Sequence, residues 1–583
     1  MLSNWRRWVD SFQQIPSESN PFNPPKDGKC PVDDLPDELL SHIFQLGVDI
    51  QQTEWEDGCS SSDDDEDVWE DVCDSDGSDD PLDNWGHDES MASSKINSIS
   101  EPQSIADVRE QGVLPFQVLV SHICRRWRSV VLGTHNLWTT LTFGPSLNIE
   151  REREFISRSH DLPLAITIDC AIEDEDLEVA RQDICKEDLD LDRTRRYLSL
   201  IELLVILDIL RPEVYHWGIF RFYGSTYDYV ERLMCVLQLM PMAPVLESFQ
   251  VHIYADDCEG YEVYPGRDIT SYLPFHGEAP NLKEAVFWGI HIDWEGAAPN
   301  FLRGLRVLEL SYLTKDVRPS YSTFAQIVKS SPELRTLTLT LAGPVLAGDV
   351  AFDSEEGWGR ETLDIPSLRE FALQFHDPPY ASALIQHLNM PNVTHLVLDF
   401  DDGDYSDFVQ TLAKPIKGQK QSLLQHITHL KISGLPCNIA SVEVLLSQLT
   451  ALQSLNLKLF SEEEEVIFAK LIEPSAETVG SALTIPAAPS TVLPKVFCPR
   501  LEELTTSVEA DDLKSLIVSR RFAGAPLKRV NLVMDSDEGL STDDETWIRS
   551  NVEELHFYEP SDSEDEVVVD HDELVEEDSD DEL

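Results

Sequence analysis

Two short segments carry residue types that could bind a metal or attack a substrate. Asp188, Asp190 and Asp192 alternate with leucine and resemble the oxygen ligands of a calcium loop, but the glycine and closing glutamate that shape such a loop are missing. Cys124 precedes two arginines, which could lower the pKa of its thiol. Because Cys124 also falls on an apolar helical stripe beside Ile123, we expect a small buried residue there and a solvated loop at Asp188 to Asp192.

The rest of the sequence lacks the common catalytic and metal-binding patterns. It contains no GxSxG turn, no HExxH pair and no GxxxxGK[ST] phosphate loop. The ten cysteines are scattered, and none forms the CxxC pair that is typical of zinc and redox sites. We therefore expect no catalytic residue, no metal site and no cofactor, and an enzyme is the least favoured class of function.

The chain is strongly acidic. Its 583 residues include 44 basic and 108 acidic side chains, which give a formal net charge of −64. Such a charge repels a phosphate backbone, so nucleic acid is not an expected partner. Two segments, Glu54 to Asp80 and Glu559 to Leu583, each hold 14 acidic residues and no Lys or Arg. The charge favours basic protein partners, and a merely well-hydrated surface is the open alternative.

The sequence shows no targeting or membrane segment. Residues Met1 to Asn20 lack the unbroken apolar stretch of a secretory signal. The longest apolar run, Tyr197 to Leu210, is interrupted by two carboxylates and is shorter than the roughly 20 residues that cross a bilayer. We therefore predict an intracellular protein of the cytoplasm or nucleus, which is not secreted and does not enter a membrane.

Two amphipathic helices are predicted near the N-terminus. The first has apolar residues at the spacing of one helical face, namely Pro36, Leu39, Leu40, Ile43 and Phe44. The second has the same spacing at Val120, Ile123, Cys124, Trp127, Val130 and Val131. Between them, residues 47–113 are rich in Asp, Glu, Ser and Gly, and such a composition buries too little apolar area to offset the entropy of ordering. We expect a disordered acidic insertion there.

From Pro244 onward one pattern recurs: an apolar residue, two variable positions, an apolar residue, one variable position and a further apolar residue. The first apolar positions are Leu246, Leu282, Leu305, Leu334, Leu368, Val393, Ile427, Leu452, Leu501, Leu527 and Val552. The last two apolar residues of each copy share one face of a strand. Helical segments lie between copies, and we expect Thr323 and Ser441 to cap two of them.

This alternation of strand and helix is typical of a leucine-rich-repeat solenoid. An ordinary α/β domain with similar buried strands is the alternative, and the asparagine expected after each strand is absent. Residues 162–166 and 217–222 resemble degenerate earlier coils, whereas 475–495 and 401–420 read as inserted loops. The fold class is therefore mixed α/β, with a polar leader at 1–30, a helical module at 31–145, a repeat domain at 146–558 and an acidic disordered tail at 559–583.

The residues of the helical module resemble a known motif. Leu35-Pro-Asp-Glu-Leu-Leu-Ser-His-Ile-Phe44 looks like the opening of an F-box, and Val120-Ser-His-Ile-Cys-Arg-Arg-Trp-Arg-Ser-Val130, followed by Asn136-Leu-Trp138, looks like its close. With the irregular repeats, the chain is similar to the F-box proteins that abound in mushroom-forming fungi. The match covers about 40 residues, and the 67-residue interval between its halves departs from the family pattern.

The resemblance implies a substrate-recognition adaptor of an SCF-type (cullin-RING) ubiquitin ligase, in which the F-box binds a Skp-type adaptor and the repeats bind an unknown protein substrate. The adaptor-binding residues carried over are Leu35, Pro36, Leu39, Leu40, Ile43, Phe44, Val120, Ile123, Trp127, Val130, Leu137 and Trp138. Of these, Pro36, Leu40 and Phe44 are expected to be outward anchors. Leu39, Ile123 and Trp127 are expected to pack internally as readily as against the adaptor. A leucine-rich-repeat scaffold without ubiquitin function is the alternative.

Overall fold

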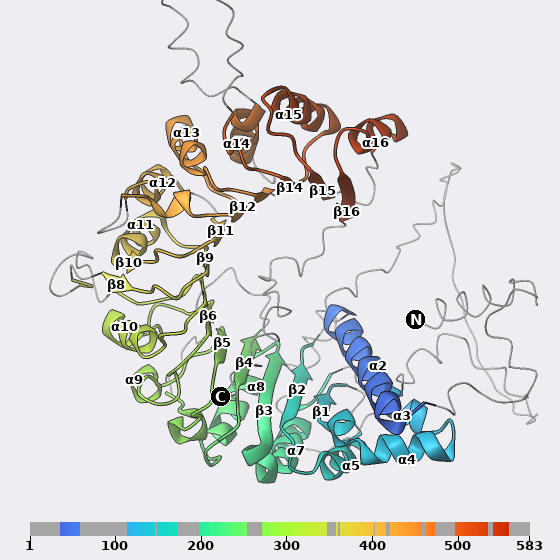
Figure 1. The fold of residues 1–583 in the computed structure, drawn as a ribbon. Helices are drawn as coiled ribbons and strands as arrows, with labels where there is room; N and C mark the ends of the chain where they lie inside the picture. The colour runs from blue at the N-terminus through green and yellow to red at the C-terminus, as the bar shows by residue number, and fades with distance from the viewer. Residues whose placement is uncertain are drawn as a thin grey trace, which may run out of the picture. The chain divides into compact units, whose positions relative to one another are not determined.

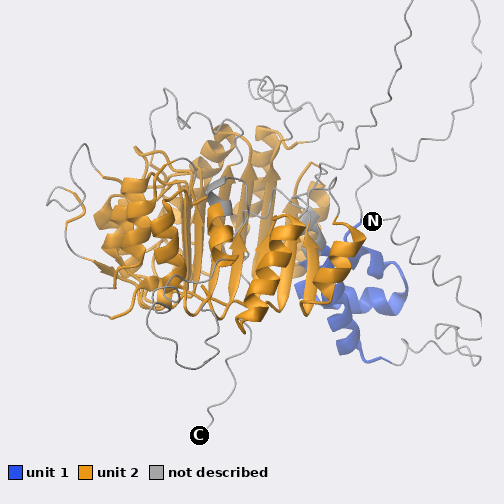
Figure 2. Cartoon of the chain, turned by 90° about the horizontal axis from the view of Figure 1, so that it is seen from above, with its two compact units in different colours: residues 1–138 blue, residues 139–583 orange. Residues whose placement is uncertain are grey.

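The computed structural model divides the chain into two compact units, residues Met1–Trp138 and Thr139–Leu583, which are drawn in different colours in Figure 2. It describes residues 35–58, 114–145, 148–172, 197–253, 271–346, 357–359, 362–400, 403–415, 420–457, 462–472, 496–533 and 540–558. The predicted polar leader, the Asp188 to Asp192 loop, the 475–495 loop and the acidic tail lie outside these residues. The boundary between the units comes seven residues before the one predicted after residue 145.

Unit 1 is helical in its described part. Its elements are α2 (Asp37–Gly58), α3 (Phe116–Ser121), α4 (Arg125–Gly133) and the 3-10 helix η3 (His135–Trp138). Helix α2 continues past the predicted start of the disordered insertion at Gly47, so that boundary is wrong. The extension is ordered because Val48 is buried and because the side-chain oxygen of Gln51 accepts a 2.6 Å hydrogen bond from the peptide N–H of Phe116. Residues 59–113 lie outside the described residues.

Unit 2 is built on one sheet of fourteen described strands, all parallel and hydrogen-bonded in chain order. Figure 1 shows the strands side by side, with helices α10 to α16 along one face of the sheet. The strands are β1 (Thr140–Phe143), β2 (Leu164–Cys170), β3 (Trp217–Gly224), β4 (Ser248–Ile253), β5 (Glu284–Trp288), β6 (Val307–Ser311), β7 (Thr336–Thr340), β9 (Glu370–Gln374), β11 (His395–Asp399), β12 (His429–Ser433), β13 (Ser454–Leu457), β14 (Glu503–Thr506), β15 (Arg529–Val533) and β16 (Glu554–Tyr558).

Helices connect most of these strands, and two short strands, β8 (Leu363–Asp364) and β10 (Leu388–Asn389), form a separate small sheet. The helices of unit 2 are α5 (Ile149–Ser159), α7 (Leu200–Leu210), η4 (Arg211–His216), α8 (Tyr227–Leu237), η5 (Pro274–Gly277), α9 (Trp294–Ala297), α10 (Tyr321–Lys329), α11 (Pro378–His387), α12 (Ser406–Leu412), η6 (Leu423–Gln425), α13 (Ile439–Gln448), α14 (Glu462–Ile472), α15 (Ala510–Phe522) and α16 (Thr542–Arg549). None of the described helices combines the length and hydropathy needed to span a bilayer. The mixed α/β class is confirmed, and the leucine-rich-repeat solenoid stays a prediction.

The recurring apolar pattern locates the strands. Each of its eleven first positions lies two residues before a strand, from Leu246 before β4 to Val552 before β16. All eleven side chains are buried. The two degenerate segments correspond to β2 and β3, whereas β1 was not predicted, and the expected loop at 401–420 contains α12. Because side chains point alternately to the two sides of a strand, one face of each strand is buried under the helices, as Leu308 and Leu310 of β6 show.

The two predicted helix caps are wrong by three residues. Helix α10 is capped by Ser320, whose hydroxyl accepts from the N–H of Thr323 at 3.2 Å. Helix α13 is capped by Asn438, whose side-chain oxygen accepts from the N–H of Ser441 at 2.9 Å. In both helices the predicted cap therefore stands at the third helical position, where its own N–H needs a partner.

A left-handed residue follows several neighbouring strands. The residues directly after β5, β6, β7 and β9, which are Gly289, Tyr312, Leu341 and Phe375, have φ angles of 63°, 54°, 47° and 55°. This conformation costs a non-glycine residue roughly 1–2 kcal/mol. It is offset by hydrogen bonds to the next strand, because Tyr312 N–H donates to the Thr340 carbonyl at 2.8 Å and Leu341 N–H to that of Gln374 at 2.8 Å. The turns after these strands are thus built alike.

We predict that Gly434→Ala lowers the free energy of unfolding by about 3 kcal/mol. Gly434 follows β12 with φ 88°, and a methyl group there would overlap the carbonyl oxygen of Phe400. Gly304→Ala is the matched control, because Gly304 has φ 73° and open space around the added carbon, so only about 1 kcal/mol should be lost. Urea unfolding measures both, and equal losses would contradict the prediction.

Candidate docking surface

The second predicted helix is divided into α3 and α4 by a turn at Cys124. Cys124 has an extended backbone, and its thiol accepts a hydrogen bond from the N–H of Trp127 at 3.4 Å, which makes it the N-cap of α4. Its side chain is exposed, so the expectation of a small buried residue is wrong. The reason is local, because a capping residue leaves the helical stripe on which the spacing had placed it.

One apolar face of α2 forms the core of unit 1. Leu40, Phe44 and Val48 recur every four residues and are 1%, 1% and 4% exposed. The ring of Phe44 lies 5.1 Å from that of Trp127 in α4, in a tilted arrangement that favours aromatic pairs. The expectation that Leu40 and Phe44 are outward anchors is therefore wrong, since they hold the helices of unit 1 together.

Polar contacts fix the same helices. The guanidinium of Arg126 donates to the carboxylate of Asp37 at 2.8 Å and to the carbonyl oxygen of Leu35. The hydroxyls of Ser41 and Thr134 are 2.9 Å apart. These contacts join the start of α2 to both ends of α4. Asp37 also lies in the first turn of α2, where a negative charge stabilises the helix dipole.

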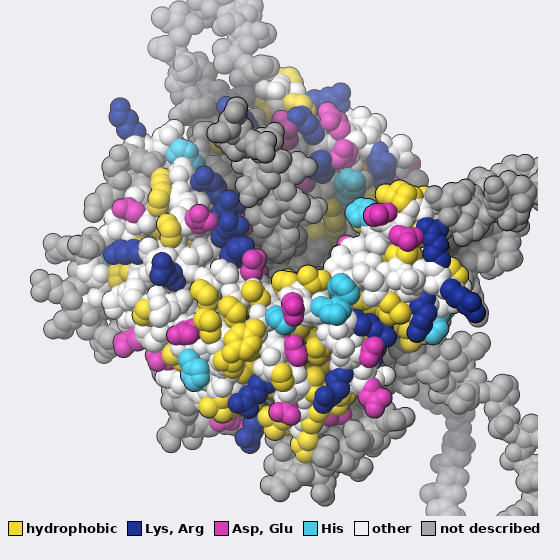
Figure 3. All heavy atoms as spheres, turned by 60° about the horizontal axis from the view of Figure 1, so that its bottom comes forward, with side chains coloured by type: hydrophobic (Ala, Val, Ile, Leu, Met, Phe, Trp, Pro, Cys, Tyr) yellow, Lys and Arg dark blue, Asp and Glu magenta, His cyan; other side chains and the backbone are white. Residues whose placement is uncertain are grey.

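A second apolar face of α2 is exposed. Leu39, Ile43, Leu46 and Ile50 recur at the spacing of one helical stripe, roughly a third of a turn from the buried face, and they are 50%, 47%, 49% and 59% exposed. We call these four residues the α2 stripe. Unit 1 also exposes Leu114, Leu119 and Ile123, so its short described part has seven large exposed apolar side chains against ten in the much longer unit 2. Figure 3 shows exposed hydrophobic side chains interspersed with charged ones over one face of the molecule.

The predicted contact residues thus fall into two groups. Leu40, Phe44, Val120, Val130, Leu137 and Trp138 are buried, and Leu35 and Trp127 are partly buried. Pro36, Leu39, Ile43 and Ile123 are exposed. Sequence reasoning missed Leu46 and Ile50, although they continue the spacing of Leu39 and Ile43, because the acidic composition after Gly47 indicated the end of the helix. It also missed Leu114 and Leu119.

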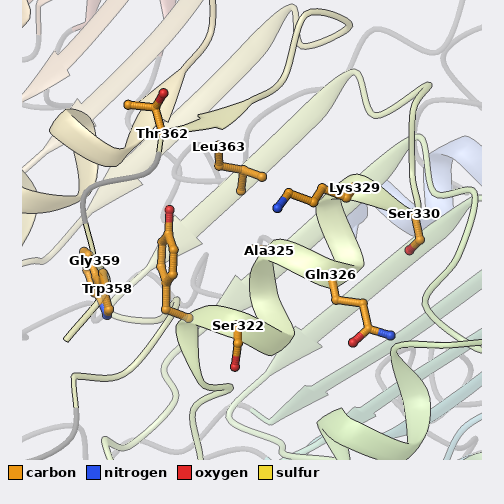
Figure 4. Close-up of a pocket in the computed structure, with 10 residues that line it drawn as sticks. Ser322, Ala325, Gln326, Lys329, Ser330, Trp358, Gly359, Thr362 and Leu363 are labelled. Carbon is orange, nitrogen blue, oxygen red and sulfur yellow. The ribbon is translucent and has the colours of Figure 1, made fainter. Parts of the chain in front are cut away.

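Unit 2 has a 680 Å³ pocket beside α10, shown in Figure 4. Tyr321 of α10 stacks on Trp358 at 5.4 Å, and Lys329 is the one charged side chain among the described residues that line the pocket. General acid–base catalysis needs a proton donor and acceptor placed on a reacting group, and the described lining supplies two titratable side chains, Lys329 and Tyr321, of which the Tyr321 ring is stacked on Trp358. The described residues also contain no cluster of three or more His, Cys, Asp or Glu arranged to hold a metal.

A buried cluster lies near the ends of β6 to β9. His376 stacks on Tyr380 at 4.6 Å, and the Tyr380 hydroxyl donates to the Pro344 carbonyl at 2.9 Å. Arg318 lies 5.9 Å from the Tyr380 ring and donates to the Leu313 carbonyl at 2.7 Å. Burial, with the nearby charge of Arg318, lowers the pKa of His376 to about 3. These contacts tie the turns after the strands together, and His376 is neutral at physiological pH.

No protein-family model and no curated protein matches the sequence. The large apolar side chains that the described part of unit 1 exposes are the α2 stripe, Leu114, Leu119 and Ile123.

We predict that Phe44→Ala lowers the stability of unit 1 by about 3–5 kcal/mol, because it removes a buried aromatic side chain and leaves Trp127 without its neighbour. Leu39→Ala, on the exposed face of the same helix, should change stability by less than about 0.5 kcal/mol. Circular dichroism during urea unfolding distinguishes the two, and a harmless Phe44→Ala would show that the internal core is assigned incorrectly.

We also predict that acid weakens unit 2 through His376. Because the folded pKa of about 3 lies below the ordinary 6.5, the unfolded chain binds the proton first as the pH falls. The free energy of unfolding should drop by about 2 kcal/mol between pH 6.5 and pH 5 from this residue alone. Urea unfolding of His376→Gln should lack that part of the pH dependence, and an identical slope in the variant would contradict the assignment.

Proposed function

We propose that this chain is a substrate-recognition adaptor of an SCF-type ubiquitin ligase, in which unit 1 binds a Skp-type adaptor and unit 2 binds a protein substrate. The observation that carries the proposal is the α2 stripe, which is apolar and exposed although a different apolar face of the helix already supplies the core. Contiguous exposed apolar side chains mark interaction surfaces, and an amphipathic helix face fits a hydrophobic groove.

The free energy gained by burying the α2 stripe is large enough for docking. Burying a Leu or Ile side chain completely contributes about 1.5–3 kcal/mol, so a half-exposed residue of the α2 stripe contributes about 1 kcal/mol when a partner covers it. Four such residues, together with Leu119 and Ile123, amount to several kcal/mol before the entropy of association is subtracted. The proposed contact set is therefore Pro36, Leu39, Ile43, Leu46, Ile50, Leu119 and Ile123.

Unit 2 supports the second half of the proposal. The eleven strands of its large sheet from β4 to β16 follow the recurring apolar pattern in chain order, as expected of leucine-rich-repeat-like coils that present one sheet face to a partner. The mechanism is proximity: the chain holds a substrate near the ligase's ubiquitin carrier and does no bond chemistry itself. The negative charge favours basic substrates. A ligase of this kind acts in the cytoplasm or nucleus.

The test is co-purification with a Skp-type adaptor. Ile43→Asp with Ile123→Asp should abolish adaptor binding while circular dichroism stays unchanged, because both side chains are exposed and a carboxylate cannot be buried in an apolar groove without a large penalty. Leu204→Asp with Leu239→Asp is the matched control, since both leucines are exposed on unit 2.

The outcomes separate the two candidate functions. Adaptor binding that survives Ile43→Asp with Ile123→Asp would place the docking surface elsewhere on unit 1. A folded wild-type chain that fails to bind the adaptor would favour the alternative, a leucine-rich-repeat scaffold without ubiquitin function, because the sheet of unit 2 is common to both candidates.

A further inference from the structure

A row of basic side chains crosses the start of four neighbouring strands in unit 2. It consists of the residues directly before β5, β6, β7 and β9, which are Lys283, Arg306, Arg335 and Arg369. The N–H of Arg306 donates to the Lys283 carbonyl at 2.6 Å, and that of Arg335 to the Arg306 carbonyl at 2.7 Å. The N–H of Arg369 continues the series to the Arg335 carbonyl at 2.8 Å. We call these four residues the basic row, and adjacent members lie about 4.8 Å apart along the sheet.

Two members of the basic row have acidic neighbours. Lys283 Nζ is 3.0 Å from the carboxylate of Glu247, and Arg306 Nε is 3.5 Å from that of Glu333. Both cations nevertheless remain open to solvent, because 43% of the Lys283 side chain and 38% of that of Arg306 are exposed. Surface pairs of this kind are worth less than about 1 kcal/mol and exchange readily for another anion.

The other two members, Arg335 and Arg369, are exposed and form no ion pair with the described residues. Arg369 donates to the carbonyl of Asn392 at 3.3 Å, which leaves its charge uncompensated. Among the described strand carboxylates, Glu370 accepts from the Thr336 hydroxyl at 2.9 Å and Glu284 accepts from the amide of Gln250 at 3.0 Å, and neither forms an ion pair with Arg335 or Arg369.

Placing like charges directly opposite each other on adjacent strands is unfavourable. In this chain the arrangement also runs against the overall charge of −64. The same strand position holds Glu247 before β4 and Thr394 before β11. Among the strands after β9, only β15 has a cation there, Lys528, which pairs with Glu502 at 2.6 Å. A bound anionic segment would remove the repulsion, and guanidinium groups are suited to carboxylates through paired hydrogen bonds.

We propose that the basic row binds the acidic tail of the same chain, residues 559–583. The tail carries 14 acidic residues and no Lys or Arg, so its charge complements the row. It begins directly after β16, which is nine strand steps from β5 and six from β9. Nine steps amount to about 43 Å, whereas an extended chain of 25 residues reaches about 80 Å. The tail is long enough to reach every member of the row.

Binding within one chain has a specific consequence. A tethered segment acts at an effective concentration in the millimolar range, so even weak carboxylate contacts keep it in place. The tail then competes with any acidic segment of another protein for the start of β5 to β9. This inference concerns unit 2 alone and does not depend on docking of unit 1 to an adaptor.

The test uses the full chain, a chain that ends at Tyr558 and a fluorescent peptide of residues 559–583. Circular dichroism first checks that the shortened chain folds like the full one. Fluorescence anisotropy at low salt should show that the shortened chain binds the peptide, and that the full chain binds it at least about tenfold more weakly because its own tail occupies the row. High salt should weaken both.

Two pairs of substitutions locate the contact on the shortened chain. Arg335→Glu with Arg369→Glu should weaken peptide binding by at least about tenfold. Arg211→Glu with Arg500→Glu makes the same charge change at exposed arginines outside the row and should change the affinity by less than about twofold.

Three results would overturn the proposal: no peptide binding by the shortened chain, equal binding by both chains, or equal effects of the two pairs of substitutions. The acidic insertion is the other segment of this chain that could occupy the row. A peptide of residues 54–80, which has the same number of acidic residues as the tail, tests this alternative. If it binds the row more tightly than the tail peptide does, the row belongs to the insertion and the assignment to the tail is wrong.

Discussion

The parallel register of the unit 2 sheet is the constraint on which the rest of that unit depends. From β3 onward each strand of the large sheet pairs residue for residue with the next, as in the match of Glu503 with Arg529 and of Arg529 with Glu554, whereas the β2–β3 pair has a register shift at Leu164 and Ala165. The connections between strands differ in length, and some contain one α-helix whereas others are long segments. The first residues of neighbouring strands nevertheless lie side by side in the sheet. Because of this register, residues that are far apart in the chain form rows across the sheet. The two faces of the sheet therefore carry different kinds of side chains.

Unit 1 is limited by its size, because it is too small to bury all of its apolar side chains in its own core. Helix α2 has two apolar faces, and Phe44 on one of them packs against Trp127 while Ile43 on the other stays exposed. Small helical modules bury a low fraction of their surface. A binding module can use the remaining apolar face to contact a partner. In a domain without a partner, polar residues would be expected to replace these exposed apolar ones.

The sequence predicted most strands of unit 2 because a buried Leu, Val or Ile two residues before a strand is a local signal. Strand β1 escaped because the buried apolar residue two positions before it is Trp138, whose sequence context places it in the F-box-like segment. The two faces of α2 could not be separated, since Leu39 and Leu40 fit the same helical spacing and only tertiary packing decides which of them is inside.

Two further features also lay beyond the sequence. Helix caps were placed three residues late because Ser, Thr and Asn residues cluster before α10 and α13, and backbone geometry selects among them. The basic row could not be recognised from the sequence, since Arg306 and Arg335 are 29 residues apart and become neighbours only through the register of β6 and β7.

The chain-order pairing of the strands also bears on how the protein is made. Each strand needs only the one before it, and near the end of the sheet the repeating positions Leu501, Leu527 and Val552 are 26 and 25 residues apart. A chain emerging from the ribosome can therefore add each new strand to an edge that already exists, without waiting for distant sequence. Contacts of such short sequence separation favour rapid folding. Until synthesis ends, the newest strand is an open edge, and in the finished sheet that position belongs to β16.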